Sequence, residues 1–221
     1  MNLILNKMEL NKIYNTDCLE FMKTLPDKCI DLVLTDPPYG IGAYKNGTMG
    51  GGVLAKQSTF RPTDWDNAIP SKDIFDEIKR VSKNQIIFGG NYFVSYLDNS
   101  PCWIVWDKDN GDNNFADCEL AWTSFRTAVR KFKFKWQGML QENMKDKEVK
   151  FHPTQKPVEL MKWCLDNYSK EGDIILDCFA GGGSTLIACK HLKRNYIGCE
   201  ISKDYCDIIQ KRLDGMTQGL F

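Results

Sequence analysis

The stretch DIILDCFAGGGSTLIACKHLKRNYIGCE, residues 173–200, decides the fold class. It opens with an apolar run at Asp173–Leu176, crosses a glycine-rich turn and continues as a helical stretch at Gly183–Leu192. A second apolar run, Tyr196–Cys199, follows directly. Apolar strands that alternate with helices are typical of a largely parallel sheet with helices packed against it. The stretch therefore predicts an α/β protein.

The same alternation extends outward to both ends of the chain. Strand-like runs lie at Lys12–Asn15, Ile30–Thr35, Gln85–Phe88, Cys102–Trp106, Cys118–Ser124 and Arg130–Trp136, and helical stretches lie at Cys18–Leu25, Ser71–Ser82, Pro157–Tyr168 and Ser202–Leu213. Asp17 and Ser71 are expected to cap two of these helices, and Pro26 to end the first. Because 221 residues are too few for two comfortable domains, we expect one domain over residues 1–221.

Composition excludes several classes of protein. Hydrophobic residues make up 43% of the chain, with 12 Phe, 6 Trp and 8 Tyr, which is enough for a buried core and excludes a disordered chain. The nine cysteines include no C-x-x-C pair, so we expect reduced and mostly buried thiols and no metal site. No window is apolar enough for a membrane span, which predicts a cytoplasmic protein.

Charge is balanced, with 29 Lys plus Arg against 29 Asp plus Glu, so any contact with nucleic acid must come from a local patch. The best patch is RTAVRKFKFKW, residues 126–136, in which Lys131, Lys133 and Lys135 alternate with Phe132, Phe134 and Trp136. Period two predicts a strand with lysines on one face and aromatic rings on the other. A solvated outer face is the plainer interpretation, and contact with a DNA backbone is the more specific one.

The glycine-rich turn, DCFAGGGST at Asp177–Thr185, suits a ligand that contains a nucleoside. Glycines at a strand-to-helix turn let a ligand approach the backbone, and the free N–H groups of the helix start suit a carboxylate or phosphate. Glu200 ends the next strand, where α/β nucleotide sites place the carboxylate that binds ribose hydroxyls. The turn lacks the Lys-Ser/Thr of a P-loop and the third glycine of a dinucleotide fingerprint. Phe179, directly after the acidic strand end, favours S-adenosylmethionine over a pyrophosphate, although a tight turn without ligand is the plain alternative.

The motif TDPPYG, at Thr35–Gly40, is more specific. The preceding apolar run stops at Asp36 because two prolines cannot continue a strand, which leaves a carboxylate at the carboxyl end of the sheet. Asp36 can accept one N–H of an amino group and the Pro37 carbonyl the other, which directs the nitrogen lone pair toward a methyl donor. Pro37 and Pro38 hold that carbonyl rigidly, and Tyr39 can stack on a base. The pattern predicts methyl transfer to an amino nitrogen conjugated with a base ring.

Three blocks of the chain resemble, in their order, the amino-methyltransferases of DNA. These blocks are NTDCLEFMKTLPDKCIDLVLTDPPYG at Asn15–Gly40, HPTQKPVELMKWCL at His152–Leu165 and DIILDCFAGGGSTLIACKHLKRNYIGCEISKDY at Asp173–Tyr205. With the catalytic motif first and the S-adenosylmethionine motif last, the order resembles the β group, whose motifs are permuted. The resemblance spans nearly the whole chain. It implies a Rossmann-like methyltransferase fold with circularly permuted motif order: a mostly parallel seven-stranded sheet with helices on both faces, in which the strands ending at Asp36 and Asp177 are neighbours.

The resemblance also assigns residues to roles. It implies catalytic roles for Asp36, Pro37, Pro38 and Tyr39, and an S-adenosylmethionine site made of Asp17, Cys18, Asp36, His152, Thr154, Lys156, Asp177, Phe179, Ala180, Gly181, Gly183, Ser184, Thr185 and Glu200. Within this set, Asp177, Phe179, Ala180 and Gly181 would line the methionine half, Glu200 would bind the ribose, and Asp17 with Cys18 would border the adenine. His152, Thr154 and Lys156 would lie near the cofactor carboxylate, although a structural or capping role fits His152 equally well.

The implied substrate is double-stranded DNA, with base flipping, because the target amine is unreachable inside a stacked duplex. Residues 41–70, with four glycines between Gly47 and Gly52, and the polar residues 107–150 are expected to be target-recognition insertions. The first insertion would close over DNA, and the lysines of the 126–136 patch would contact phosphates. A homodimer, the recognition sequence and a restriction partner stay open.

Adenine is the expected target base, because Asp at the first position of the tetrapeptide is usual for N6 methylation in this family, whereas Ser is common for N4 methylation of cytosine. N4-cytosine methylation stays an alternative. Methylation of RNA or of a protein side-chain amide is less favoured, since Asn often leads the tetrapeptide there. A nucleoside-binding oxidoreductase would need the missing third glycine, and a non-catalytic nucleic-acid-binding module leaves both chemical motifs unexplained.

Overall fold

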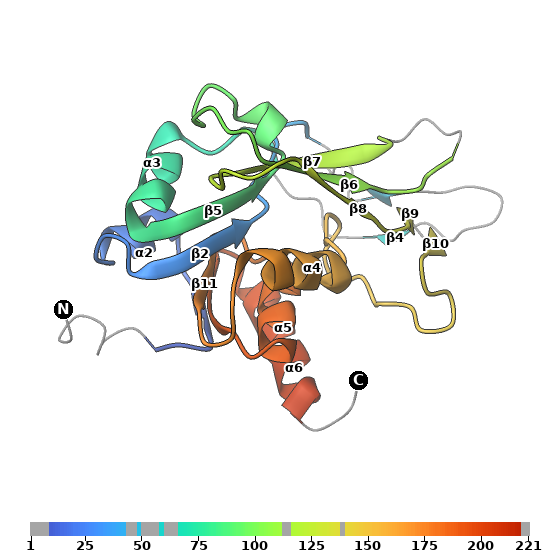
Figure 1. Cartoon of the computed structure of the whole chain (residues 1–221). Coiled ribbons are helices and arrows are strands. Elements are labelled where there is room, and N and C mark those ends of the chain that lie inside the picture. Colours follow the sequence, from blue (N-terminus) through green and yellow to red (C-terminus); the bar gives the residue numbers. More distant parts are fainter. Residues whose placement is uncertain are drawn as a thin grey trace.

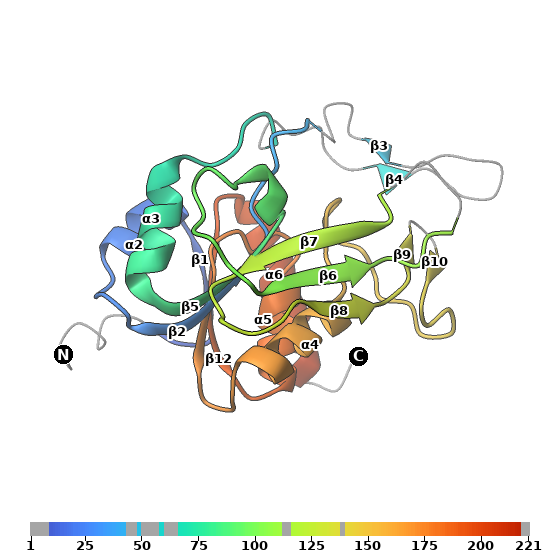
Figure 2. The same ribbon diagram turned by 45° about the horizontal axis from the view of Figure 1, so that its top comes forward.

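The central element of the structure is one eight-stranded sheet (Figures 1 and 2). The computed structural model describes residues 9–42, 48–49, 58–59, 66–111, 116–137 and 140–217. In sheet order the strands are β1 (Lys12–Asn15), β12 (Asn195–Glu200), β11 (Ile174–Asp177), β2 (Ile30–Thr35), β5 (Ser82–Phe88), β7 (Cys118–Thr123), β6 (Trp103–Asp107) and β8 (Arg130–Lys133). Pairing is parallel from β1 across to β5 and between β6 and β8, whereas β7 runs antiparallel to both of its neighbours.

The sheet has one strand more than the seven expected, and the extra strand is at its edge. Arg130–Lys133 forms β8, which pairs in parallel with β6 from Ile104↔Arg130 to Asp107↔Lys133. The ladder ends at Lys133, and Trp136–Gln137 (β9) pairs instead with Leu140–Gln141 (β10). The single strand expected at Arg130–Trp136 is therefore divided between the sheet edge and a small hairpin, because its second half finds a partner outside the sheet.

Helices cover both faces of the sheet, as expected (Figure 1). The helices α2 (Cys18–Lys23) and α3 (Lys72–Val81) share one core with the sheet, and α4 (Val158–Tyr168), α5 (Ser184–His191) and α6 (Lys203–Thr217) share the other. Successive residues of β2 point to opposite faces, so that Leu32 and Leu34 enter the second core and Val33 enters the first. This two-sided burial explains why β2 reads as a continuous apolar run.

Local start signals agree with the sequence in part. The Asp17 carboxylate accepts hydrogen bonds from the backbone N–H groups of Leu19 and Glu20 at 2.8 and 3.1 Å, which confirms it as the cap of α2. Ser71 does precede α3, but its side chain makes no capping hydrogen bond. The sequence thus predicts where α3 begins, but the predicted capping hydrogen bond from the Ser71 side chain is not present.

The pairing that organises the site is the parallel contact between β2 and β11. Ile175 lies opposite Leu32 and Leu176 opposite Val33, so both strands end at the same edge of the sheet. Asp177 ends β11 and Asp36 follows β2, and the Thr35 hydroxyl donates to an Asp177 oxygen at 2.8 Å. The expectation that these two strand ends are neighbours is confirmed.

The two segments expected to be recognition insertions are described only in part. Residues 43–47, 50–57 and 60–65, with the glycines at 47 and 50–52, lie outside the described residues, and Thr48–Met49 (β3) pairs antiparallel with Ser58–Thr59 (β4). In the second segment, β7 lies between β5 and β6 and β8 forms the sheet edge. Within residues 107–150, Asp107, β7 and β8 thus belong to the eight-stranded sheet, and the residues between and after these strands are the portion outside it.

Two further expectations concern cysteines and membranes. Seven of the nine cysteines are buried, Cys29 is half-buried and Cys118 is exposed, which confirms that most of them are buried. Among the helices within the described ranges, none is long and apolar enough to cross a membrane.

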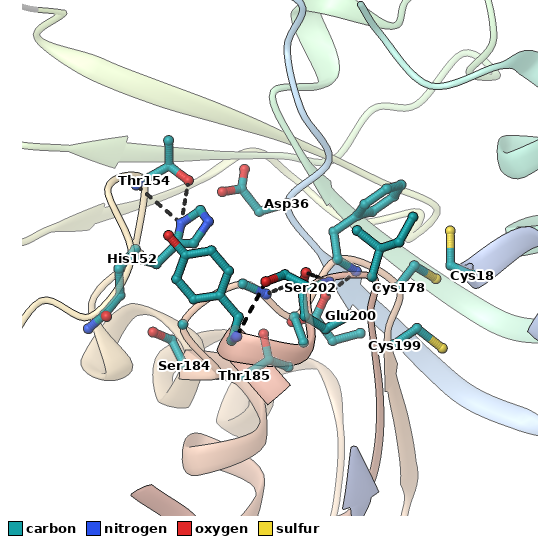
Figure 3. Close-up of a pocket in the computed structure, with 18 of the residues that line it drawn as sticks. Cys18, Asp36, His152, Thr154, Cys178, Ser184, Thr185, Cys199, Glu200 and Ser202 are labelled. Carbon is teal, nitrogen blue, oxygen red and sulfur yellow. Dashed lines mark hydrogen bonds between the residues drawn. The ribbon is translucent and has the colours of Figure 1, made fainter. Parts of the chain in front are cut away.

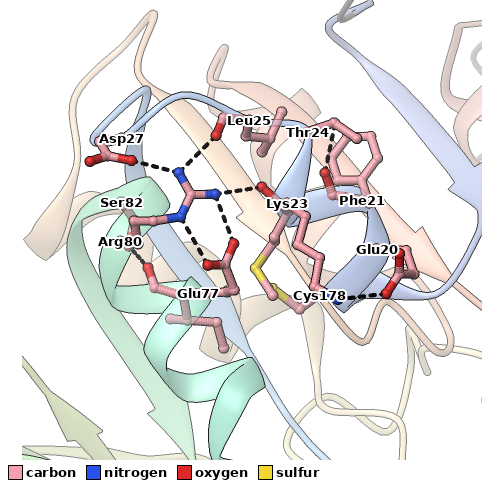
Figure 4. Close-up of polar contacts among 12 residues, drawn as sticks. Glu20, Phe21, Lys23, Thr24, Leu25, Asp27, Glu77, Arg80, Ser82 and Cys178 are labelled. Atoms are coloured by element: carbon pink, nitrogen blue, oxygen red, sulfur yellow. Dashed lines mark hydrogen bonds and ion pairs between the residues drawn. The ribbon is translucent and has the colours of Figure 1, made fainter.

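Arg80 at the end of α3 ties that helix to the loop after α2 (Figure 4). Its guanidinium donates to the carbonyls of Leu25 and Met22 at 2.9 and 2.8 Å and forms ion pairs with Asp27 and Glu77 at 2.6 and 2.7 Å. A planar guanidinium can serve this many acceptors at once because it carries five donors in a fixed fork. The contact joins the two helices that cover one face of β2.

Arg80→Met should lower the free energy of unfolding by about 2 kcal/mol, because it keeps the aliphatic stem but leaves two backbone carbonyls and Glu77 without their donor. Denaturant titration followed by circular dichroism measures the change. Lys72→Met is the matched control, since it removes only an exposed ion pair with Asp76 and should leave the midpoint in place. Equal midpoints for the two variants would contradict the role of Arg80.

Candidate active site

A cavity of about 280 Å³ lies at the carboxyl ends of β11, β2 and β12 (Figure 3). This is where open α/β sheets bind their ligands. Its lining is Thr16, Asp17, Cys18, Asp36, Pro38, His152, Thr154, Gln155, Lys156, Met161, Asp177, Cys178, Phe179, Ala180, Gly181, Gly182, Ser184, Thr185, Cys199, Glu200, Ile201, Ser202 and Tyr205. The three blocks quoted from the sequence therefore meet around one hollow.

The residues expected to hold the cofactor are brought together with one exception. All of them line the cavity except Gly183, which is the residue before α5. Gly183 has a φ of +81°, and a Cβ there would come within 2.9 Å of the Ile209 side chain on α6. The glycine is needed for a left-handed turn and for close packing of α5 on α6, and it does not face the cavity.

The glycine loop is fastened to Glu200. The backbone N–H of Gly181 donates to one Glu200 oxygen at 2.9 Å, and the N–H of Ser202 donates to the other at 2.8 Å. Burial raises the pKa of the Glu200 carboxyl, and these N–H groups oppose that shift. The carboxylate is thus fixed at the cavity wall, with lone pairs left for hydroxyl donors of a ligand.

Asp177 lies at the floor of the cavity and is buried. Burial raises the pKa of its carboxyl to about 6, although hydrogen bonds from Thr35 and Thr185 and from the Phe179 N–H oppose the shift. Because the folded state holds the proton more tightly than the unfolded chain does, ionising Asp177 costs stability.

The HPTQKP block forms the opposite wall. His152 Nδ1 lies 3.0 Å from the Thr154 hydroxyl, and the His152 ring makes an edge contact with the Tyr205 ring at 4.5 Å. Burial lowers the pKa of His152 to about 4, and the charge of Lys156 adds to this, so the imidazole is neutral at physiological pH. The Ser184 hydroxyl donates to the Lys156 carbonyl at 2.6 Å, which anchors this wall to the first turn of α5.

Lys156 points at the catalytic motif. Its ammonium lies 2.5 Å from one Asp36 oxygen, and the Tyr39 hydroxyl donates to the other Asp36 oxygen at 2.6 Å. Lys156 lines the cavity, and its side chain ends at Asp36. Asp36 is thus engaged by two side chains from different parts of the chain.

Tyr39 and Pro37 complete the motif beside the cavity, although neither lines it. The Tyr39 ring stacks on Tyr92 with centroids 4.7 Å apart and an interplanar angle of 14°. Gly89 makes room for the ring, since a Cβ there would lie 2.1 Å from it. Among the described residues, no N–H donates to the carbonyl of Pro37. The motif therefore offers an unused acceptor next to a carboxylate and a ring already in a stacked arrangement.

The predicted lysine face has the expected geometry and carries unexpected counter-charges. Phe132 and Phe134 pack against the core, while the lysines at 131, 133 and 135 are exposed to 64%, 57% and 38%. Lys131 pairs with Asp107 at 3.3 Å, and Lys133 and Lys135 pair with Asp109 at 2.8 and 3.3 Å. Two acids thus offset part of the charge of this face.

Several site residues carried no sequence signal. Glu119 on β7 and Lys108 after β6 lie within the ion-pair cluster at Asp36, yet neither belongs to a motif. Gln155 does lie inside the HPTQKP block but is not among the predicted site residues, and its side-chain oxygen would lie 2.7 Å from a Cβ at Gly182. Within the described ranges, no three His, Cys, Asp or Glu side chains are grouped so as to hold a metal ion.

A nucleoside-sized cavity beside an Asp-Pro-Pro-Tyr turn, both at the strand ends of an α/β sheet, defines the class of amino-methyltransferases. Residues 106–211 match the family described as DNA methylase. The chain is 32% identical to the type II methyltransferase M.HinfI of Haemophilus influenzae over 92% of this chain and 68% of that protein. It is 29% identical to M.HpaI of Haemophilus parainfluenzae over 92% of this chain and 74% of that protein.

Solved structures agree with the fold. M1.HpyAVI, in a complex with SAM, aligns with a TM-score of 0.57 and 24% identity over 91% of this chain and 98% of that one. The cytosine-N4-specific PvuII DNA methyltransferase aligns with a TM-score of 0.60 and 14% identity over 90% and 85%. The chain belongs to the DNA methylase family, the N6 and N4 amino-methyltransferases, and the resemblance seen in its three blocks is confirmed.

Asp177→Asn should make the protein more stable at pH 8, by up to about 3 kcal/mol, because the amide removes the cost of a buried carboxylate and keeps an oxygen for Thr35. For wild type, the stability tied to this group is present in full below pH 3.8 and is lost as the pH rises through about 6. The advantage of the variant should therefore shrink between pH 6 and pH 4. Urea titrations at several pH values measure it, and a variant less stable than wild type at pH 8 would contradict the assignment.

Proposed function

We propose that the protein transfers a methyl group from S-adenosylmethionine to the N6 amino group of adenine in double-stranded DNA. The observation that carries this proposal is the position of Asp36 on the wall of the cavity, next to the unused Pro37 carbonyl. A carboxylate and a carbonyl side by side are the two acceptors that an amino group needs to lose its conjugation with the ring.

The cavity fits S-adenosylmethionine by its chemistry. Asp17 lies just after β1 and Glu200 at the end of β12. In these positions Asp17 would lie beside the adenine, and Glu200 would bind the ribose hydroxyls. Phe179 and Ala180 supply apolar walls, and the start of α5 presents N–H groups to a carboxylate. When bound, this cofactor supplies a methyl group on a positively charged sulfur, which needs no metal to react.

The chain's own groups would then prepare the amino nitrogen. Asp36 would accept one N–H and the Pro37 carbonyl the other, so that the nitrogen lone pair points toward the cavity. Tyr39 would stack on the base, in the manner in which it stacks on Tyr92. The amino nitrogen would form the new bond with its lone pair and would pass one proton to the Asp36 carboxylate, and the cofactor, without its methyl group, would leave as a neutral thioether. Burial of the site keeps water away from this exchange.

Adenine is favoured over cytosine by Asp36, since Asp leads the tetrapeptide of N6 enzymes in this family while Ser is common in N4 enzymes. Residues 41–70 and 107–150 would recognise the target sequence around the flipped base.

Purified protein with methyl-labelled S-adenosylmethionine should label unmethylated duplex DNA, and nucleoside analysis should identify the product as N6-methyladenine. Asp36→Ala should reduce the rate by at least about 100-fold while still binding the cofactor, because it removes an acceptor that acts on the amine. N4-methylcytosine in the digest would correct the base and keep the mechanism. Label in RNA or protein controls, with none in DNA, would contradict the proposal.

The lysine face would contact the DNA backbone. Replacing Lys131, Lys133 and Lys135 together by Gln should weaken DNA binding and reduce the salt slope by about 1, since each neutralised phosphate contributes roughly 0.9 and two acids already offset part of the charge. Filter binding at several salt concentrations measures the slope. Lys12→Gln with Lys203→Gln is a control on exposed lysines elsewhere, and a triple variant with the control's slope would remove this face from the DNA interface.

A further inference from the structure

Lys156 is shared between two carboxylates. Its ammonium lies 2.5 Å from Asp36 and 3.1 Å from Glu119, and only 7% of its side chain is exposed. Asp36 comes from the turn after β2 and Glu119 from β7, two strands away in the sheet. A buried cation held by two anions divides its interaction between them, so a change at one carboxylate changes the other.

Glu119 has a second cation of its own. Lys108, directly after β6, lies 2.5 Å from the other Glu119 oxygen and 5.1 Å from the centre of the Trp106 ring. The four groups thus form a chain, Lys108–Glu119–Lys156–Asp36, with two positive and two negative charges. Glu119 does not line the cofactor cavity, whereas Asp36 and Lys156 do. Glu119 and Lys108 therefore lie outside the cofactor site, and Lys156 connects them to the Asp36 carboxylate.

The arrangement restricts access to Asp36. One Asp36 oxygen receives the Tyr39 hydroxyl and the other receives Lys156, so an incoming amine must compete with a side-chain donor that is already in place. If Asp36 were the only carboxylate that paired with Lys156, the amine would displace this lysine less easily, because the ammonium would have no other counter-charge. Glu119 draws the same ammonium in another direction.

We propose that Glu119 is a positioning residue for methyl transfer, which draws the Lys156 ammonium toward itself and so leaves Asp36 able to accept an N–H of the target amine. This inference rests on the proposed function, since it assigns a role within that reaction. It adds a residue that does not line the cofactor cavity and that contacts the motif through the Tyr39 hydroxyl at 3.5 Å.

The charges around Asp36 favour this role. Facing it are Lys156 from the loop before α4, Glu119 from β7, Tyr39 from its own turn and Asp177 from β11, with Lys108 behind Glu119. Burial raises the pKa of Asp36, Lys156 opposes that shift, and Glu119 adds to it. Burial would also raise the pKa of Glu119, but its two lysines outweigh that effect and lower it to about 2. Glu119 therefore stays charged and Asp36 stays the more basic of the two carboxylates, because two cations act on the first and one acts on the second.

The test is the pH dependence of methyl transfer to duplex DNA at saturating cofactor, for full-length wild type, Glu119→Gln, Lys108→Gln and Lys156→Gln. In Glu119→Gln the acid limb of the profile should move down by about one pH unit, because a negative charge is lost and Lys156 is left to Asp36. The rate on the plateau should fall about tenfold, since the amine then competes with Lys156. Lys108→Gln and Lys156→Gln each remove a positive charge and should move the acid limb up.

Two controls separate positioning from folding. Glu77→Gln removes a carboxylate that pairs with Arg80 far from the cavity, and it should leave the acid limb where wild type has it. Calorimetric titration with S-adenosylmethionine should give Glu119→Gln the wild-type affinity, because Glu119 does not line the cavity. Should Glu119→Gln not fold, Lys108→Gln carries the test alone, since Lys108 pairs with Glu119 and is the member of the four-charge cluster farthest from Asp36 in the order of contacts.

An active wild type whose acid limb stays in place in Glu119→Gln, or moves in the same direction in Glu119→Gln and Lys108→Gln, would overturn the role of Glu119 and leave the proposed function standing. In the fallback case, an acid limb that does not move in Lys108→Gln would do the same. A wild type that transfers no methyl group to DNA would contradict both.

Discussion

The parallel pairing of β2 with β11 is the constraint on which the rest of the site depends. These strands are separated by more than a hundred residues in the chain, and the hydrogen bond from Thr35 to Asp177 joins positions 142 residues apart. Parallel register places both strand ends at one edge of the sheet, so the catalytic turn and the glycine loop open into the same hollow. A slip of one residue would turn Thr35 to the other face and separate the two acids.

A second constraint holds the glycine loop in place from behind. Arg212 on α6 donates to the Gly182 carbonyl and pairs with Glu148 at 3.2 Å, and Glu148 in turn accepts from the Gln155 side chain at 2.7 Å. Gln155 also receives the Phe151 N–H at 2.8 Å. These contacts join α6, the HPTQKP block and Glu148 to the glycine loop, on the side of the loop where Arg212 lies. Because each partner is satisfied by another, these contacts fix the conformation of the loop.

The chemistry of the site depends on groups that are kept in one protonation state by burial and by their neighbours. Burial, with the charges of Asp36 and Glu119, raises the pKa of Tyr39 well above its usual value, so the phenol stays a donor to Asp36. Burial opposes the charge on Lys156, yet the same two carboxylates outweigh it and raise the pKa of the ammonium. A neutral His152 faces this cluster from the HPTQKP wall. Fixed donors and acceptors of this kind suit a reaction in which the cofactor brings the driving force and the protein orients a neutral amine.

The sequence by itself determined the alternation of strands and helices, the two chemical motifs and 14 of the 23 residues that line the cavity. It could do so because apolar periodicity and the special residues of turns, such as the prolines after Asp36 and the glycines after Ala180, act over a few neighbouring residues. It did not reveal that Gly183 packs against Ile209, and it joined β8 and β9 into one strand.

Only the tertiary structure decided which charges meet. Lys156 lies 120 residues from Asp36, Glu119 comes from β7, and Lys108 comes from the loop directly after β6. Nothing in the local pattern of a lone Glu or Lys distinguishes a solvated surface charge from one that is buried against a catalytic carboxylate. That difference arises from strand order and from the loss of water on folding, and both are properties of the assembled sheet.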